Sequence, residues 1–344
     1  MYEKGRECVA KFINAKEISE IVFTRGATEG INLVAYSWGL NHLKKDDEVL
    51  VSLMEHHSNI VPWEIVAKTR GFKINYVNVT SDGILDVKEF ENKITAKTKI
   101  VCLSHVSNVT GMVNKIKELS KIVHDHGAML FVDGAQSVPH MKVDVQDLNV
   151  DFLVFSGHKM LGPTGIGVLY GKKTLLQQME PFQGGGEMIK EVAFDSKNQQ
   201  CNISWNESPW KFEAGTPNIC GVVGLAAAIQ YLEQIGMDNI LAHEQALTKY
   251  AIDGMKNLCK VSLYGPTDSS KCGIIPFNVA GLSSHDVALL CDSYGIAIRS
   301  GYHCAQPLHQ IFQLQSSARA SFYLYNTIEE IDRFLEVLKE LQLL

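Results

Sequence analysis

Several polar side chains that could take part in chemistry come directly after apolar runs of the sequence. Their order along the chain is His56, Asn108, Asp133, Gln136, Ser156, His158 and Lys159. Each apolar run is short and rich in β-branched residues, which is typical of a buried strand. Ligands bind beyond the carboxyl ends of the strands in open α/β sheets. We therefore expect these side chains to share one site.

This set of side chains meets the needs of pyridoxal 5'-phosphate (PLP). PLP requires a lysine that forms an imine with it, an anion beside its pyridine nitrogen and a flat group against its ring. Lys159, Asp133 and His56 supply these groups, whereas we expect the neighbouring His57 to be structural. The alternatives are a surface lysine, a carboxylate that caps a turn, and a histidine satisfied within the core.

A phosphate site is expected near Thr28. Gly26, Ala27 and Thr28 follow the apolar run 20–24 and open an amphipathic segment. The free N–H groups and the positive dipole end at the start of a helix suit a phosphate. Taken alone, this pattern favours only a tight turn, so the assignment depends on the other cofactor residues.

Cys304 is the candidate nucleophile. It lies in the polar segment 299–307, unlike several other cysteines, which lie in apolar runs. A cation at Arg299 or His303 would lower the pKa of the thiol and favour the reactive thiolate. The alternative is a buried structural thiol. A zinc site at His303, Cys304 and His309 would lack a second pair of ligands, so no metal is expected.

A mostly parallel sheet with helices on both faces would position these residues. The strand candidates are residues 20–24, 47–53, 72–79, 99–105, 128–133, 151–156 and 165–170. Amphipathic helical segments alternate with them, which is typical of an α/β fold. Residues 114–126 show helical spacing, and Gly127 suits the C-terminal cap of that helix.

The length and patterning of the chain predict two domains. Residues 184–215 break the α/β pattern and predict a long, irregular surface excursion rather than a core element. Residues 221–236 predict a helix that leads out of the sheet domain. We expect a large PLP-binding domain at 1–234 and a smaller α+β domain at 235–344 that carries Cys304.

The composition excludes several classes of protein. The formal net charge is -6 and no lysine or arginine run is present, which argues against nucleic-acid binding. No window approaches the ~20 apolar residues of a membrane span, and no secretory signal is recognisable. The eight cysteines contain no C-x-x-C pair and predict reduced core thiols in a reducing, cytoplasmic setting.

The motifs together resemble the class V aminotransferases, and within them the SUF-type (group II) cysteine desulfurases and selenocysteine lyases. The resemblance covers essentially the whole chain and implies the fold-type I architecture of PLP-dependent transferases. Its motifs are FTRGATEGIN, MEHHSNIVPW, SHVSNVTG, FVDGAQSVPH, FSGHKMLGPTGIGVLYG, FEAGTPN, IRSGYHCAQP and ARASFYLYNT.

The resemblance implies a role for each cofactor residue. In such enzymes the residue matching His56 stacks on the ring, and the one matching Asp133 pairs with the ring nitrogen. The residue matching Gln136 hydrogen-bonds the ring oxygen, and Lys159 would form the Schiff base. The phosphate would be held by residues matching Thr28, Ser156 and His158.

The resemblance also implies a substrate site and a homodimer. Residues matching Asn108 and Arg319 hold the substrate carboxylate, and Arg299 would support that end of the site. The turn at Gly215 and Thr216 reaches the phosphate of the other subunit in such enzymes. Thr216 would therefore complete the partner's site.

The implied reaction is the desulfuration of L-cysteine to L-alanine. Lys159 would remove the α-proton, and Cys304 would take the sulfur as a persulfide for an acceptor protein in iron–sulfur cluster assembly. The alternatives are a selenocysteine lyase, another class V PLP enzyme such as a transaminase, and a weakly active or non-catalytic relative.

The resemblance begins inside a predicted helix near Met1. Group II desulfurases carry a further segment ahead of the matching position, with small residues on the substrate side of the pocket. Without that segment, we expect PLP binding to persist. Turnover should be weak, because an open pocket admits water and loses positioning contacts.

Overall fold

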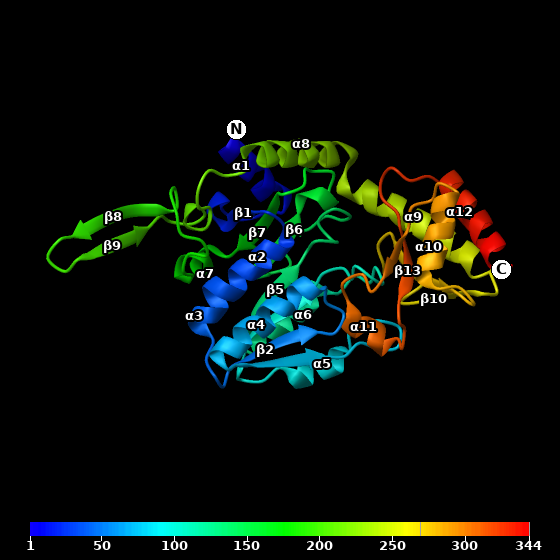
Figure 1. Cartoon of the computed structure of the whole chain (residues 1–344), viewed down its shortest axis with the longest axis horizontal. Coiled ribbons are helices and arrows are strands. Elements are labelled where there is room, and N and C mark those ends of the chain that lie inside the picture. The colour runs from blue at the N-terminus through cyan, green and yellow to red at the C-terminus, as the bar shows by residue number, and fades with distance from the viewer. Residues whose placement is uncertain (269, 344) are drawn as a thin grey trace.

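A seven-stranded sheet forms the centre of the larger part of the molecule (Figure 1). The computed structural model describes residues 1–268 and 270–343. The sheet order is β1-β7-β6-β5-β4-β2-β3, and β7 runs antiparallel to both neighbours while the other pairs are parallel. All seven predicted strands are confirmed. Their bounds are β1 (Ile21–Thr24), β2 (Glu48–Ser52), β3 (Lys73–Val77), β4 (Thr98–Ser104), β5 (Met129–Asp133), β6 (Phe152–Ser156) and β7 (Gly167–Gly171).

Helices cover both faces of this sheet. The predicted helix over 114–126 is confirmed as α6, and Gly127 follows it with a left-handed φ of 73°. Short single turns at His57–Asn59 and Gly157–Lys159 carry site residues. The helices are α1 (Tyr2–Phe12), α2 (Ala27–Val34), α3 (Leu40–His42), α4 (Val61–Arg70), α5 (Val87–Lys93), α6 (Ile116–Asp125), α7 (Lys173–Gln178) and α8 (Ile219–Ile235).

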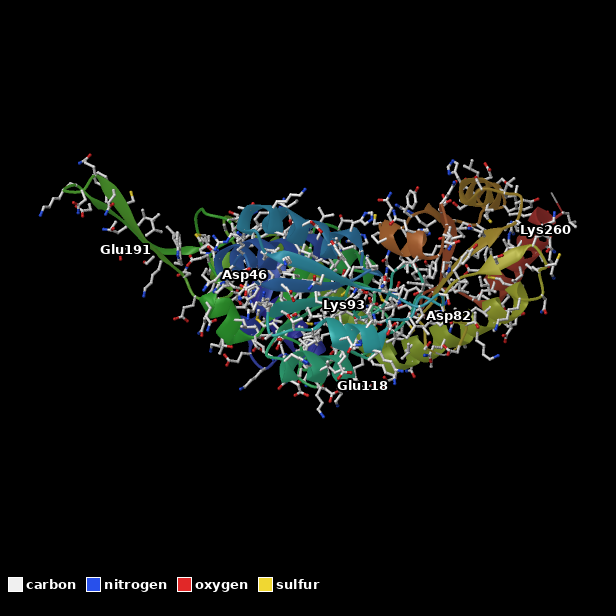
Figure 2. The ribbon with its side chains drawn as sticks, turned by 90° about the horizontal axis from the view of Figure 1, so that it is seen from below. Asp46, Asp82, Lys93, Glu118, Glu191 and Lys260 are labelled. Carbon is white, nitrogen blue, oxygen red and sulfur yellow. The ribbon has the colours of Figure 1, made fainter. Side chains whose placement is uncertain are left out.

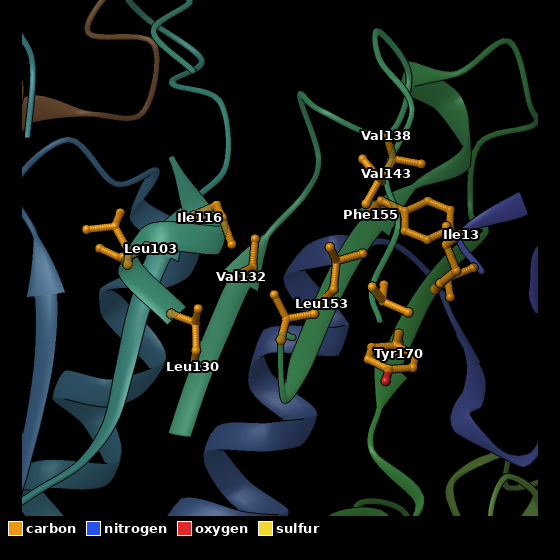
Figure 3. Packing of buried hydrophobic residues seen from close by; sticks show 14 of the residues in the cluster. Ile13, Leu103, Ile116, Leu130, Val132, Val138, Val143, Leu153, Phe155 and Tyr170 are labelled. Carbon is orange, nitrogen blue, oxygen red and sulfur yellow. The ribbon is translucent and has the colours of Figure 1, made fainter. Parts of the chain in front are cut away.

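The two faces of the sheet pack into two separate cores. Along β5, Leu130 and Val132 belong to the core beneath α1, α6 and α8, whereas Phe131 belongs to the core beneath α2 and α4. Figure 3 shows Leu130 and Val132 beside Leu153 and Phe155 of β6 in the first core. Because both faces are buried, these strands are continuous apolar runs, as parallel sheets require.

The C-terminal part builds a second sheet with its own core. Its strand order is β10-β11-β13-β12, all antiparallel. The predicted helix over 221–236 is confirmed as α8, and the chain turns at Gly236 into α9. The domain boundary after 234 stays a prediction. The elements are α9 (Met237–Met255), β10 (Val261–Leu263), β11 (Ile274–Val279), α10 (Ser284–Ser293), β12 (Arg299–Gly301), α11 (Gln306–Ile311), β13 (Ser317–Ser321) and α12 (Ile328–Leu341).

Helices α8 and α9 meet at 74° and together have the length and composition of a bent membrane span. No single helix within residues 1–268 and 270–343 is long and apolar enough to cross a membrane.

Most of the excursion predicted over 184–215 is exposed, although Ser208, Lys211 and Phe212 are buried, and the prediction that it is irregular was wrong for residues 189–205. Strands β8 (Ile189–Asp195) and β9 (Gln200–Trp205) form a hairpin that extends away from the body, as Figures 1 and 2 show. Val192 lies opposite Ile203, and Phe194 opposite Cys201, so one face of the hairpin is apolar. Frequent polar residues and a lack of burial hid this alternation in the sequence.

The prediction that the cysteines other than Cys304 are core thiols is only partly correct. All eight cysteines are free, and Cys102, Cys272 and Cys291 are buried. Cys201, Cys220 and Cys259 are exposed, which corrects the prediction for these three. Cys201 lies on the hairpin, and Cys220 lies on a face of α8 that no described element covers. Apolar neighbours in the sequence therefore did not indicate burial at these positions.

Candidate active site

A cavity of about 160 Å³ opens where β2, β4, β5 and β6 end. Each strand delivers its polar residues to this edge of the sheet, because parallel strands end side by side. The structure brings eight of the predicted residues together here. They are Thr28, His56, Asn108, Asp133, Gln136, Ser156, His158 and Lys159.

Lys159 and Asp133 form the charged centre of the cavity. Lys159 is partly buried, and its amine has no hydrogen-bond partner in the described part of the chain. Burial lowers the pKa of this amine, and the Asp133 carboxylate partly opposes that effect. Oδ1 of Asp133 accepts the Ala135 N–H at 2.9 Å, and no described residue donates to Oδ2. A carboxylate oxygen and an amine are thus left for a ligand.

The turn after β2 presents His56 to the same cavity. Its Nδ1 accepts the Ser58 N–H at 3.1 Å, which fixes the tilt of the ring. Burial lowers the pKa of His56, and Asp133 partly opposes this. A neutral imidazole at this position offers a flat face for a ring system.

The start of α2 forms the other end of the cavity. The Ala27 N–H donates to Ser156 Oγ at 2.9 Å, and the Thr28 and Ser58 hydroxyls lie 2.8 Å apart. Gly167 makes this arrangement possible, since a Cβ there would lie 2.4 Å from the Cα of Gly26. Hydroxyl groups beside a helix start provide donors for a phosphate.

These residues fit PLP. The unpartnered amine of Lys159 can attach the aldehyde, and the open oxygen of Asp133 can accept from a protonated pyridine nitrogen. The hydroxyl groups of Thr28 and Ser156 lie at the helix start, where a phosphate is favoured. The cavity also holds His56, whose ring can lie beside the ring of the cofactor.

Asn108 lines the cavity, and the two arginines lie on strands of the smaller sheet. Nη1 of Arg319 donates to the Asn108 carbonyl oxygen at 2.7 Å, and Nη2 has no acceptor in the described residues. Arg319 on β13 pairs with Arg299 on β12. Burial first, and then the charge of Arg299, lower the pKa of Arg319. An anion such as a carboxylate would relieve this repulsion.

Cys304 is exposed and lies next to the buried His303. A negative charge on Cys304 raises the pKa of both Lys159 and Arg319 against the effect of burial, so the thiol lies within their electrostatic reach. His303 does not act as a cation. Burial, together with Arg319 and His309, lowers its pKa to about 3.

The expectation that His303 would activate the thiol was therefore wrong. Its Nε2 lies 3.0 Å from both the carbonyl oxygen and Oγ of Ser317. The ring is buried beneath the loop that carries Cys304. His309 Nε2 lies 3.0 Å from the same hydroxyl. The two histidines fix the loop rather than ionise beside Cys304.

Thr216 lies away from the cavity that holds the other cofactor residues. It lines a separate cavity of about 310 Å³ together with Arg25 and Glu29. The structure thus does not bring Thr216 to the cofactor residues of its own chain. Its role toward a second subunit stays a prediction.

Sequence reasoning missed the buried Glu55. Its carboxylate accepts from Ser52 Oγ at 2.5 Å, from Asn59 Nδ2 at 2.8 Å and from Ser104 Oγ at 3.3 Å. Burial raises its pKa to about 7, and the charge of Asp133 adds to this. The sequence signal for this residue was its position, since a glutamate directly precedes His56. The residue holds the turn that presents His56.

Comparison with known proteins shows similarity over nearly the whole chain. The family profile described as aminotransferase class-V matches residues 1–334. A probable cysteine desulfurase of Halalkalibacterium halodurans is 51% identical over 340 residues, which cover 98% of this chain and 82% of that protein. A probable cysteine desulfurase of Halobacterium salinarum is 48% identical over 339 residues, with 98% and 80% covered.

Solved structures agree with these relatives. The crystal structure of the cysteine desulfurase CsdA (S-sulfonic acid) from Escherichia coli matches with a TM-score of 0.94 at 40% identity, covering 100% of this chain and 84% of that one. The apo cysteine desulfurase from Thermococcus onnurineus NA1 matches with a TM-score of 0.94 at 42% identity, covering 99% and 83%. The chain has the PLP-dependent transferase fold and belongs to the class-V aminotransferase family.

Proposed function

We propose that this protein is a PLP-dependent cysteine desulfurase that converts L-cysteine to L-alanine and takes the sulfur as a persulfide on Cys304. The observation that carries the proposal is the exposed thiol of Cys304, on a loop that accepts a hydrogen bond from Asn108 of the cofactor cavity, whose carbonyl oxygen accepts from Arg319. Similarity to proteins named cysteine desulfurase, at 40–51% identity, supports it. A thiol at this position has no part in transamination.

Lys159 and Asp133 carry the first half of the reaction. Bound PLP withdraws electrons from the α-carbon of the amino acid attached to it. Asp133 holds the cofactor's ring nitrogen in the protonated state that this requires. Burial lowers the pKa of Lys159, so its Nζ can be neutral and accept the α-proton.

Arg319 and Asn108 orient the substrate. Nη2 of Arg319 is left without an acceptor in the described residues, and a substrate carboxylate would provide one. The charge of Arg299 on the adjacent strand favours the same anion. The substrate's carboxylate end is thereby fixed, and its side chain can be turned toward Cys304.

Cys304 carries the second half. Its thiolate attacks the sulfur of the substrate and forms an S–S bond while the bond between Cβ and sulfur breaks. The electron pair of the broken bond remains with Cβ. The desulfurated amino acid then takes up protons and is released as L-alanine. The sulfur stays on Cys304 as a persulfide, and a thiol of an acceptor protein in iron–sulfur assembly would remove it.

A homodimer in the cytoplasm is part of the proposal. The apolar face of the β8–β9 hairpin leaves Phe194 63% exposed, and a second copy would cover it. Thr216 would then serve the partner's cofactor. Eight free cysteines suit a reducing compartment.

Replacement of Cys304 by serine tests the proposal. The purified wild-type protein should release alanine from L-cysteine, and Cys304→Ser should abolish this while the visible cofactor spectrum and its change on adding L-cysteine persist. Unchanged alanine release by Cys304→Ser would overturn the role of Cys304. Turnover of L-selenocysteine but not L-cysteine by the wild type would instead identify a selenocysteine lyase.

A further inference from the structure

The main chain around Cys304 has an unusual conformation. His303 and Cys304 are consecutive non-glycine residues with left-handed φ values of 51° and 57°. Side chains disfavour this region, and residues remain there only where surrounding contacts hold them. The contacts that hold this loop therefore decide where the thiol lies.

Two residues of the large sheet unit supply such contacts. The His57 N–H donates to the Cys304 carbonyl oxygen at 2.7 Å, and Asn108 Nδ2 donates to the His303 carbonyl oxygen at 2.7 Å. The Gln306 N–H, at the start of α11, donates to Nε2 of His57 at 3.1 Å. His57 thus contacts the loop on both sides of Ala305, through its main chain and its ring.

The imidazole of His57 can do this only when Nε2 carries no proton. Burial lowers the pKa of His57, and acceptance of the Gln306 N–H by Nε2 leaves Nδ1 to carry the proton of a neutral ring. His57 does not line the cavity that contains His56 and Lys159. Its ring centroid lies 6.4 Å from that of His56, and its hydrogen bonds to the loop are those with Cys304 and Gln306.

We propose that His57 is a positioning residue that docks the Cys304 loop against the cofactor cavity through the bond from the Gln306 N–H to its Nε2. This rests on the proposed role of Cys304 as the nucleophile. The docked loop holds the thiol at the mouth of the site. Loss of the ring acceptor frees the start of α11 and lets the loop relax, while the cofactor residues stay in place.

Two substitutions with matched chemistry test the acceptor. His57→Gln places an amide oxygen near the position of Nε2, whereas the shorter amide of His57→Asn ends near the position of Nδ1. Both keep the main-chain bond to Cys304. A misplacement of about 1 Å can slow a reaction ~100-fold, so His57→Asn should form the Cys304 persulfide about 10- to 100-fold more slowly in a single turnover. His57→Gln should retain most of the wild-type rate.

The initial change of the cofactor spectrum on adding L-cysteine should be the same in the wild type and both variants. Equal persulfide rates in the three proteins would overturn the proposal. So would equal losses in both variants, because a general disturbance of the fold would then explain them. Thermal unfolding in the absence of substrate checks that the two variants are equally folded.

Alkylation of Cys304 gives a readout that does not depend on turnover. The holoenzyme is treated with iodoacetamide, and the rate at Cys304 is divided by the rate at the exposed Cys259 of the smaller sheet unit. His57→Asn should raise this ratio several-fold, and His57→Gln should not. A ratio unchanged in His57→Asn contradicts loop docking by His57. If the wild type released no alanine, the proposed function would fail, whereas the alkylation ratio would still decide the docking role.

Discussion

Oε1 of Glu244 lies 2.9 Å from Nδ1 of His140 in a buried contact that joins the two sheet-containing parts of the chain. His140 belongs to the connection that follows Asp133, and Glu244 lies on α9. Tyr323 reinforces the contact, since its hydroxyl donates to the Pro139 carbonyl oxygen at 2.9 Å. The segment that carries Asp133 is thereby tied to the sheet that carries Arg319.

Removal of His140 should destabilise the protein strongly. Oε2 of Glu244 is buried and no side chain within residues 1–268 and 270–343 donates to it, so His140→Ala removes the one side chain there that pairs with the carboxylate. Breaking a buried pair in this way lowers the free energy of unfolding by about 3–5 kcal/mol. Glu244→Gln keeps an acceptor for the ring, and a loss of about 1 kcal/mol is expected. Urea unfolding of both variants checks this, and equal losses would contradict it.

Glu55 should make the stability fall as the pH rises. Its pKa is about 7 in the folded chain against 4.5 for an unperturbed glutamate, so the folded state keeps a proton that the unfolded state loses. The stabilising effect is complete below about pH 4.5 and is lost as the pH rises through 7. A shift of this size corresponds to about 3 kcal/mol.

Comparison with Glu55→Gln isolates this effect. The glutamine cannot ionise. Between pH 5 and pH 8 the unfolding free energy of the wild type should therefore fall relative to that of Glu55→Gln. Asn59 Oδ1 is buried with no donor among the residues that the structure describes, and it could accept from a protonated Glu55 after the amide turns. A difference that does not change with pH would show that Glu55 stays ionised.

Lys159 should be the point of covalent attachment for PLP. Treatment of the yellow holoenzyme with borohydride should leave a pyridoxyl group that peptide mass spectrometry maps to Lys159. Lys271 is the control, because burial lowers its pKa to about 8 although it lies outside the cavity that contains Lys159. A pyridoxyl group on Lys271 rather than Lys159 would refute the assignment.

The hairpin should control dimer formation through one of its faces. Phe194→Asp places a charge on the apolar face, and sedimentation should show more monomer than in the wild type. Ala193→Asp places the same charge on the opposite face and should leave the dimer intact. Equal sedimentation of both variants would exclude this face as the interface.

Complementation tests the shared site. Lys159→Ala and Thr216→Val chains should each be inactive, and mixing them should restore part of the activity, because a mixed dimer contains one site with both native residues. A mixture that stays inactive, although mixed dimers form, would place Thr216 outside the site.

The strands and the positions of the cofactor residues could be predicted because both depend on local sequence. A strand buried on both faces is an apolar run, and the residue after it lies at the sheet edge, as Asp133 and Lys159 do. The hairpin was missed because its alternating residues are exposed on both faces.

The contacts of His57 and Glu244 could not be predicted, because each joins residues that are far apart in the sequence. His57 and Gln306 are separated by 249 positions, and His140 and Glu244 by 104. The neutral state of His303 was also missed. Its pKa follows from burial within the folded loop, whereas the sequence shows only an arginine and a cysteine nearby.

The pairing of β1 with β7 has a consequence for synthesis on the ribosome. Ile21 lies opposite Tyr170, so the first strand of the sheet has no neighbour until the seventh has been translated. At roughly 5–20 residues per second, about seven to thirty seconds separate the two strands. During this interval the apolar side chains of β1 and α1 are exposed on a nascent chain. Docking of β1 into the sheet is therefore a late step in folding.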